Sequence, residues 1–206
     1  MTHFILIRHG ETEWNRVVRF RGRADISLND VGLAQATATA RRVAAEWQPA
    51  AIYCSPMVRA RQTAQAVAER VGLPVQTHEG LHDIDFGQLQ GLTVDEAVAR
   101  WPEVVRSWAA TPEATRFPGG ERLADLRGRS TAMLTELTDR YPDQTVVLVG
   151  HTVINRVILL GVLGLGLERF WHLGQDTCAV NVFEATAGDY VLHSLNDTCH
   201  LRDLAG

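Results

Sequence analysis

Apolar and polar positions alternate in blocks along the chain, and the blocks predict strands and helices in turn. Residues 4–7 and 145–149 are continuous apolar runs, which are typical of strands buried on both faces of a parallel sheet. A shorter strand is expected over residues 51–53. Between these runs, apolar residues near helical spacing predict helices over about residues 31–47 and 58–71.

The second half of the chain continues the alternation. A long helix is expected over residues 121–141, and another over about residues 152–163, after the strand at 145–149. Residues 179–183 and 190–192 have the character of closing strands. Strands that alternate with helices in this way are typical of an α/β fold.

The middle of the chain is less regular. Three prolines break residues 89–120 into short pieces, and Thr93 with Glu96 has the pattern of a capping box that opens a short helix. Long irregular segments in compact domains are often lids. We therefore predict a single domain over residues 1–206, with an insertion of short helices and loops at about 89–120 that covers a pocket.

Composition narrows the classes of function. The 206 residues are 46% hydrophobic and 21% charged, which is ordinary for a globular protein, and the net charge of -4 argues against bulk nucleic-acid binding. All 20 basic residues are arginines, so mechanisms that need a Schiff-base lysine or a phosphate-loop lysine are excluded. A local anion site fits better than a nucleic-acid surface, because five arginines crowd the start of the chain: Arg8, Arg16, Arg19, Arg21 and Arg23.

Cysteine usage and hydropathy predict a cytoplasmic protein. Cys54, Cys178 and Cys199 are odd in number and lack the C-x-x-C spacing, so neither a disulfide framework nor a zinc site is expected. The apolar residues before Arg8 are too few for a signal peptide, and the segment 157–167 is too short to span a bilayer. No membrane contact is expected.

Candidate chemistry lies at the ends of the predicted strands. Arg8, His9 and Gly10 follow the first strand, His151 follows the strand at 145–149, and Arg59 opens the helix after the second strand. Polar groups just past the carboxyl ends of parallel strands face one crevice if the strands are neighbours. Helix N-termini there favour anions. These positions predict an anion-binding site.

The motif over residues 8–15 is Arg-His-Gly-Glu-Thr-Glu-Trp-Asn, and it matches without a mismatch the signature R-H-G-E-[TS]-x-[WYF]-N. Further blocks at 19–22, 55–64, 81–87 and 149–151 follow in matching order. The chain therefore resembles the histidine phosphatase superfamily, the phosphoglycerate-mutase-like group. The resemblance implies a three-layer α/β/α sandwich with a mostly parallel central sheet, and an insertion over the active site.

The resemblance also implies a mechanism and its residues. His9 would attack phosphorus as a neutral imidazole and form a phosphohistidine, without a metal or another cofactor. The substrate would be a small phosphorylated metabolite. Planar arginine forks suit the stabilisation of a phosphoryl group. Arg8, Arg59 and His151 are expected to act with His9 in catalysis. The expected substrate-binding residues are Arg8, Asn15, Arg21, Gly22, Arg59, His151 and Thr152.

Asp83 takes the place of the general acid in this resemblance. The common pattern has a glutamate there, so Asp83 must approach the leaving group more closely to donate its proton. A bound phosphate dianion is expected to raise its pKa, because like charge disfavours ionisation. Asp85 is the local competitor for the role.

Three functions remain in competition at this point. A phosphomonoesterase is favoured over a phosphoglycerate mutase, because mutases carry a paired-arginine segment where this chain has only the isolated Arg106 and Arg116. A catalytically idle protein that binds a phosphorylated ligand is the third alternative. The sequence leaves the substrate and the oligomeric state open, although Arg21, Arg23 and Arg116 are candidates to bind a second anionic group.

Overall fold

A computed structural model describes residues 1–204 of the chain. Its centre is a six-stranded sheet in the order β3-β2-β4-β1-β5-β6. Five strands run in one direction and β5 alone runs in the opposite one, so the prediction of a mostly parallel sheet is confirmed. The strands are β1 (Thr2–Arg8), β2 (Pro49–Cys54), β3 (Val75–Thr77), β4 (Thr145–Gly150), β5 (Val180–Thr186) and β6 (Asp189–Asp197).

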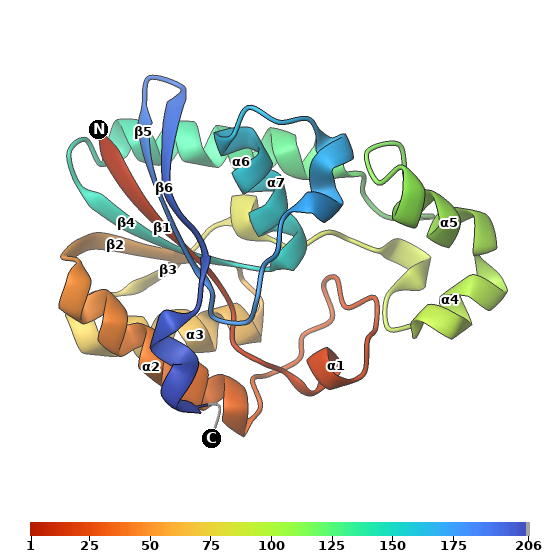
Figure 1. The fold of residues 1–206 in the computed structure, drawn as a ribbon, viewed down its shortest axis with the longest axis horizontal. Helices are drawn as coiled ribbons and strands as arrows, with labels where there is room; N and C mark the ends of the chain where they lie inside the picture. The colour runs from red at the N-terminus through yellow and green to blue at the C-terminus, as the bar shows by residue number, and fades with distance from the viewer. Residues whose placement is uncertain (205–206) are drawn as a thin grey trace.

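Helices cover both faces of the sheet, as Figure 1 shows. One face carries α2 (Asp30–Glu46) and α3 (Val58–Val71), and the other carries α6 (Leu123–Arg140) and α7 (Thr152–Val162). Successive side chains of a strand point to opposite faces, so every position of β1 between Phe4 and Ile7 is buried against one helical layer or the other. The predicted three-layer α/β/α sandwich is confirmed.

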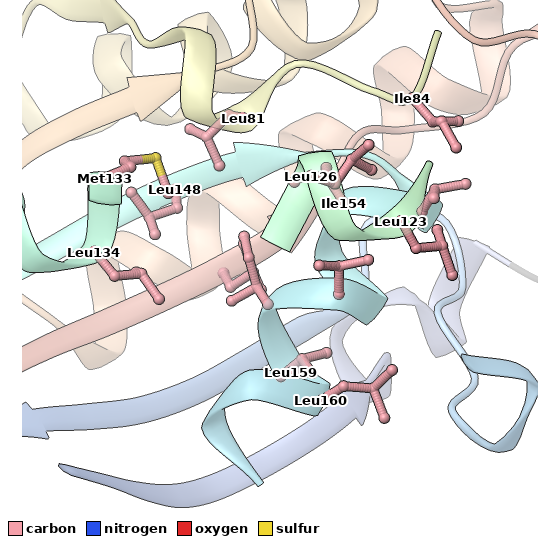
Figure 2. Close-up of a cluster of buried hydrophobic side chains, with 14 of the residues drawn as sticks. Leu81, Ile84, Leu123, Leu126, Met133, Leu134, Leu148, Ile154, Leu159 and Leu160 are labelled. Carbon is pink, nitrogen blue, oxygen red and sulfur yellow. The ribbon is translucent and has the colours of Figure 1, made fainter. Parts of the chain in front are cut away.

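The layer formed by α6 and α7 holds the larger hydrophobic core. Figure 2 shows Leu81 close to Leu148 of β4, with Met133 of α6 beside them, whereas Ile84 lies at the opposite end of the cluster, near Leu126. These residues are fully buried. Leu81 and Ile84 flank the segment that carries Asp83, so the core anchors this otherwise irregular stretch.

Two short helices, α4 (Val94–Arg100) and α5 (Pro102–Ala110), lie at one edge of the sandwich within the stretch predicted as an insertion (Figure 1). The capping box predicted before α4 is confirmed: the Thr93 hydroxyl accepts from the Glu96 backbone N–H at 3.2 Å, and the Glu96 carboxylate accepts from the Thr93 N–H at 2.8 Å.

Some short elements were not predicted. They are the edge strand β3, the single-turn helix α1 (Glu13–Arg16) and four 3-10 helices at Glu79–Leu81, Gly87–Leu89, Leu167–His172 and Cys199–Leu204. Each is too brief to show a hydrophobic period. No helix within residues 1–204 has the length and apolarity to cross a lipid bilayer.

Candidate active site

The carboxyl ends of β1 and β4 bring the two strand-end histidines together. In the parallel register Arg8 pairs with Gly150, and the backbone N–H of His9 donates to the carbonyl of Gly150 at 3.0 Å. The ring centroids of His9 and His151 are 5.1 Å apart. Both side chains are buried, and the predicted proximity of the two strand ends is present.

The surroundings of His9 fix the position of its proton. Its Nδ1 lies 2.7 Å from the carbonyl oxygen of Gly10, which can only accept a hydrogen bond, so Nδ1 carries the proton and Nε2 carries the lone pair. Burial lowers the pKa of His9 well below its usual value, and the positive charges of Arg59 and Arg8 lower it further. His9 is therefore a neutral imidazole with a free nucleophilic nitrogen.

His151 has the opposite arrangement. Arg59 donates from its Nε to the Nδ1 of His151 at 3.2 Å, so this Nδ1 is the acceptor and Nε2 carries the proton. That Nε2 is buried and has no hydrogen-bond partner among the described residues. Burial, followed by the charge of Arg59, lowers the pKa of His151 well below its usual value. His151 therefore offers one N–H donor with no protein acceptor.

Arg59 is fully buried and ties the site to the loop that precedes α2. It donates to the carbonyls of Ala24 at 2.7 Å and Gly22 at 2.8 Å. Gly22 has a φ of 50°, in the left-handed region, and an added Cβ would lie 2.8 Å from the Ile84 carbonyl oxygen. Burial lowers the pKa of Arg59 to about 10, so it keeps its positive charge at neutral pH. Three of its five N–H groups bond to protein atoms, which leaves two for a ligand.

Arg8 is the second buried cation at the end of β1. Its guanidinium donates to the carbonyl of Gln175, and its Nε has no partner in the described part of the chain. Burial lowers the pKa of Arg8 to about 10, and the charge of Arg21 contributes in the same direction. A buried guanidinium that keeps its charge and has an N–H group without a protein acceptor favours the binding of an anion.

Asp83 is the carboxylate nearest to these groups. One of its oxygens lies 3.9 Å from Arg59, and the other is buried without a hydrogen-bond partner among residues 1–204. Its backbone carbonyl accepts from Arg129 at 3.1 Å and from Arg23 at 3.4 Å, which holds the segment in place. Burial raises the pKa of Asp83, although the charge of Arg59 acts in the opposite direction. A raised pKa was expected from bound phosphate, but burial already raises it in the free protein.

Asp85 occupies a different environment. Its carboxylate accepts from the backbone N–H of Gly87 at 2.8 Å and lies 3.9 Å from Arg23, while Glu121 accepts from its own N–H. Asp85 is not among the residues that line the cavity described in the next paragraph.

A cavity of about 410 Å³ opens above His9. Its polar lining includes His9, Arg21, Asp83 and Thr152, and two further cations, Arg19 and Arg156, also line it. The rest of the wall is apolar or aromatic and comes from five separate parts of the chain: Val18 and Phe20, then Phe86, then Val94, Val105, Trp108 and Ala109, then Val153, and then Phe170 and Trp171.

Five of the predicted site residues line the cavity: His9, Arg21, Gly22, Asp83 and Thr152. The other four do not line it. Three of these are buried beside His9, namely Arg8, Arg59 and His151, and the fourth is Asn15. The Asn15 side-chain oxygen accepts from Arg21 at 2.8 Å and from the Thr12 N–H at 2.9 Å. In this structure Asn15 therefore orients Arg21 rather than facing the cavity itself.

Sequence reasoning missed Arg156 and the aromatic wall. Arg156 follows Thr152 by one helical turn on α7, which places both on one helix face. This i, i+4 spacing was the available signal, but nothing in the sequence shows which face of the helix borders a cavity. No group of three or more His, Cys, Asp or Glu side chains within residues 1–204 is placed to hold a metal ion.

Comparison with known proteins agrees with this geometry. A model of the histidine phosphatase superfamily (branch 1) matches residues 4–198. Phosphoserine phosphatase 1 of Hydrogenobacter thermophilus is 37% identical over 98% of this chain and 96% of its own length. The metal-independent phosphoserine phosphatase of Arabidopsis thaliana is 31% identical over 99% of this chain and 85% of its own length.

Solved structures give the same result. Bacillus stearothermophilus YhfR superposes with a TM-score of 0.93 and 28% identity, covering 98% of this chain and 100% of that one. A mycobacterial glucosyl-3-phosphoglycerate phosphatase in complex with VO3 superposes with a TM-score of 0.86 and 29% identity, over 95% and 99% of the two chains. With the signature, the fold and the paired histidines in agreement, the chain belongs to branch 1 of the histidine phosphatase superfamily.

Proposed function

We propose that the chain is a metal-independent phosphomonoesterase that hydrolyses a small phosphorylated metabolite through a phosphohistidine on His9. The observation that carries this proposal is the pair of opposite tautomers at the two strand ends. His9 presents a lone pair on Nε2, and His151 presents an unpartnered N–H, next to two buried arginines. A nucleophile beside hydrogen-bond donors and cations suits phosphoryl transfer.

In the first half-reaction, Nε2 of His9 attacks phosphorus as the bond from phosphorus to the leaving oxygen breaks. Arg8, Arg59 and the N–H of His151 stabilise the negative charge on the phosphoryl oxygens. Protonated Asp83 donates its proton to the leaving oxygen, so an alcohol departs rather than an alkoxide. The Gly10 carbonyl stabilises the positive charge that develops on the His9 ring.

In the second half-reaction, water attacks the phosphohistidine and the phosphorus–nitrogen bond breaks. The Asp83 carboxylate, now ionised, takes a proton from this water. Orthophosphate is released, and His9 returns to the neutral tautomer with its proton on Nδ1. Each group ends in the state in which it began.

The curated relatives suggest which substrates to test first. Two of them bear the name phosphoserine phosphatase, and the mycobacterial structure bears that of a glucosyl-3-phosphoglycerate phosphatase. A mutase requires that phosphate return to the product instead of reaching water. Hydrolysis remains favoured over mutase activity, because the insertion carries only the isolated Arg106 and Arg116. The cytoplasmic location of the protein stays a prediction.

The proposal is tested by phosphate release from a panel of phosphomonoesters, with a chelator present. The panel includes phosphoserine, 3-phosphoglycerate and 4-nitrophenyl phosphate. We expect chelator-resistant release, and loss of at least about 10³-fold in His9→Ala, because the nucleophile is removed. Isomerisation of 3-phosphoglycerate faster than phosphate release would favour the mutase, whereas tight vanadate binding without turnover of any ester would favour the idle binding protein.

A further inference from the structure

Arg156 lines the cavity and is a cation to which the proposed reaction assigns no partner. It projects from α7, an eleven-residue helix whose other residues are largely buried and apolar. Its guanidinium carbon lies 5.1 Å from the ring centroid of Phe170 and 5.3 Å from that of Trp171. Its Nε is buried and has no hydrogen-bond partner, and it forms no ion pair with any carboxylate that the structure describes.

This arrangement presents the guanidinium for a ligand. Stacking on aromatic faces holds the plane of an arginine in place and leaves its N–H edge free. Such a planar fork matches the two oxygens of a carboxylate or of a second phosphoryl group. Burial lowers the pKa of Arg156 from its usual value, although the charge of Asp176 acts in the opposite direction, so an anion that pairs with Arg156 also offsets the cost of partial burial.

The wall next to Arg156 has a different character. Apolar side chains continue from Phe86 and Trp108 inside the cavity to Val18 and Val94 at its rim, where Val18 is 67% exposed and Val94 is 41% exposed. A cavity of about 410 Å³ is within the range of roughly 300–1,000 Å³ that takes drug-sized ligands. Both features suit a leaving group with an apolar body.

Anionic groups are scarce in the same cavity. Of the described residues that line it, Asp83 alone carries a carboxylate, and the proposed reaction needs that carboxyl protonated to act as the acid. Arg19, Arg21 and Arg156 all repel a cation. An ammonium group on the substrate therefore has no counter-charge to pair with there.

We propose that the substrate is a phosphomonoester whose leaving group combines an apolar or aromatic body with an anionic substituent, and that Arg156 binds this substituent. The inference rests on the proposed function, because the phosphoryl group at His9 anchors one end of the substrate. Arg156 lies one turn beyond Thr152, which is about 6 Å along the helix axis. The two anionic groups of the substrate would then lie at opposite ends of its apolar body.

Three esters with closely similar leaving oxygens test this inference: benzyl phosphate, 4-carboxybenzyl phosphate and 4-(aminomethyl)benzyl phosphate. In the unmodified enzyme we expect kcat/KM to be about 10- to 100-fold higher for the carboxylated ester than for benzyl phosphate, and lowest for the cationic ester. This range corresponds to one charge-assisted hydrogen-bonded pair. A cationic ester that equals or exceeds the carboxylated one overturns the inference.

Arg156→Met and Arg169→Met form a matched pair of variants. Arg169 is exposed, lies on the neighbouring 3-10 helix and does not line the cavity. We expect the ratio of kcat/KM between the carboxylated and neutral esters to fall toward one in Arg156→Met, to recover in part in Arg156→Lys, and to stay at the unmodified value in Arg169→Met. An unchanged ratio in a folded Arg156→Met variant assigns the preference to another residue and overturns the role of Arg156.

Binding measurements separate this inference from the proposed function. Benzylphosphonate and 4-carboxybenzylphosphonate cannot be hydrolysed, and their affinities are measured by calorimetry. If no ester is turned over but the carboxylated phosphonate binds about 10-fold or more tightly than the neutral one, hydrolysis is excluded and the anion subsite is supported. If all three esters are turned over at similar rates and the two phosphonates bind equally, the phosphatase stands and the anion subsite is excluded.

Discussion

Asp83 and Asp85 lie two positions apart, yet their carboxylates have different surroundings. Asp83 is 7% exposed and lines the cavity, whereas the Asp85 carboxylate accepts from the backbone N–H of Gly87. Asp83→Asn is expected to lower kcat for an alkyl phosphate by about 10²- to 10⁴-fold, since an alkoxide needs a proton. The loss is expected to be far smaller with 4-nitrophenyl phosphate, whose leaving group departs without one.

Asp85→Asn is the control for that prediction, because an amide oxygen can still accept from Gly87. We expect its activity on both esters to stay within about threefold of the unmodified enzyme. If Asp85→Asn shows the leaving-group dependence and Asp83→Asn does not, the two aspartates have been assigned the wrong way round.

The pH dependence of activity follows from the shifted pKa values of Asp83 and His9, the two groups that exchange a proton or attack phosphorus in the proposed reaction. Asp83 must be protonated to donate, and burial raises its pKa, so kcat/KM for an alkyl phosphate is expected to fall as pH rises through that raised value. His9 must be neutral, and its pKa is lowered well below 6.5, so no acid limb is expected near that pH. A profile measured with Asp83→Asn should lack the basic limb, and a persistent limb would assign it to another group.

At the scale of elements, the segment after β1 and the start of α2 touch through two glycines. A Cβ on Gly32 would lie 2.1 Å from the carbonyl oxygen of Glu11, and one on Gly10 would lie 2.5 Å from the carbonyl oxygen of Gly32. This close approach lets the start of α2 pack directly against the loop that carries His9. No other residue type fits there without moving one of the two segments.

Gly32→Ala is therefore expected to lower the free energy of unfolding by about 1–3 kcal/mol, through overpacking against backbone. Gly128→Ala on α6 is the matched control, because nothing lies within 4 Å of its added Cβ and alanine favours a helix. That variant is expected to gain about 0.5–1 kcal/mol. Urea denaturation of both variants measures the difference, and equal effects would exclude the close approach as the cause.

The role of residues 89–120 as a lid over the cavity stays a prediction. The capping box of this segment predicted α4 from the sequence, and α4 and α5 supply Val94, Val105, Trp108 and Ala109 to the cavity wall. Phe170 and Trp171, whose rings pack against Trp108, belong to the 3-10 helix Leu167–His172, whose sequence shows no readable period. For that reason the aromatic character of the cavity could not be predicted.

At the scale of the whole molecule, most of the fold and the residues at the centre of the site could be predicted from the sequence. Long apolar runs and long helices were predicted because burial in three layers imposes a strong pattern on them. The pairing of His9 with His151 was predicted because the ends of parallel strands meet. The cavity lining was not, since it depends on which of several helix faces and loops turn toward one another.

Folding stability is expected to decrease as pH falls below about 6.5. Burial keeps His9 and His151 neutral in the folded protein, with pKa values well below the usual one, while the unfolded chain takes up protons on both. Each group contributes about 1.4 kcal/mol per pH unit between its two pKa values. The lowered pKa values of His82 and His200 act in the same direction.

Urea denaturation at pH 7 and pH 5 tests this dependence, in buffers without phosphate because a bound anion would stabilise the folded state. His151→Gln removes one of the two main groups, so its stability is expected to fall less steeply with decreasing pH. A slope in His151→Gln equal to that of the unmodified protein would show that His151 does not contribute.

The pairing of β1 with β4 has a consequence for the synthesis and folding of the protein. The nucleophile lies near the start of the chain, and the N–H donor of His151 follows a strand formed only after about two thirds of the residues have been made. Closing a parallel pair across such a long stretch is slow relative to local helix formation. A nascent chain that ends before β4 therefore cannot transfer phosphate, and the return of activity during refolding reports completion of the central sheet rather than of any single helix.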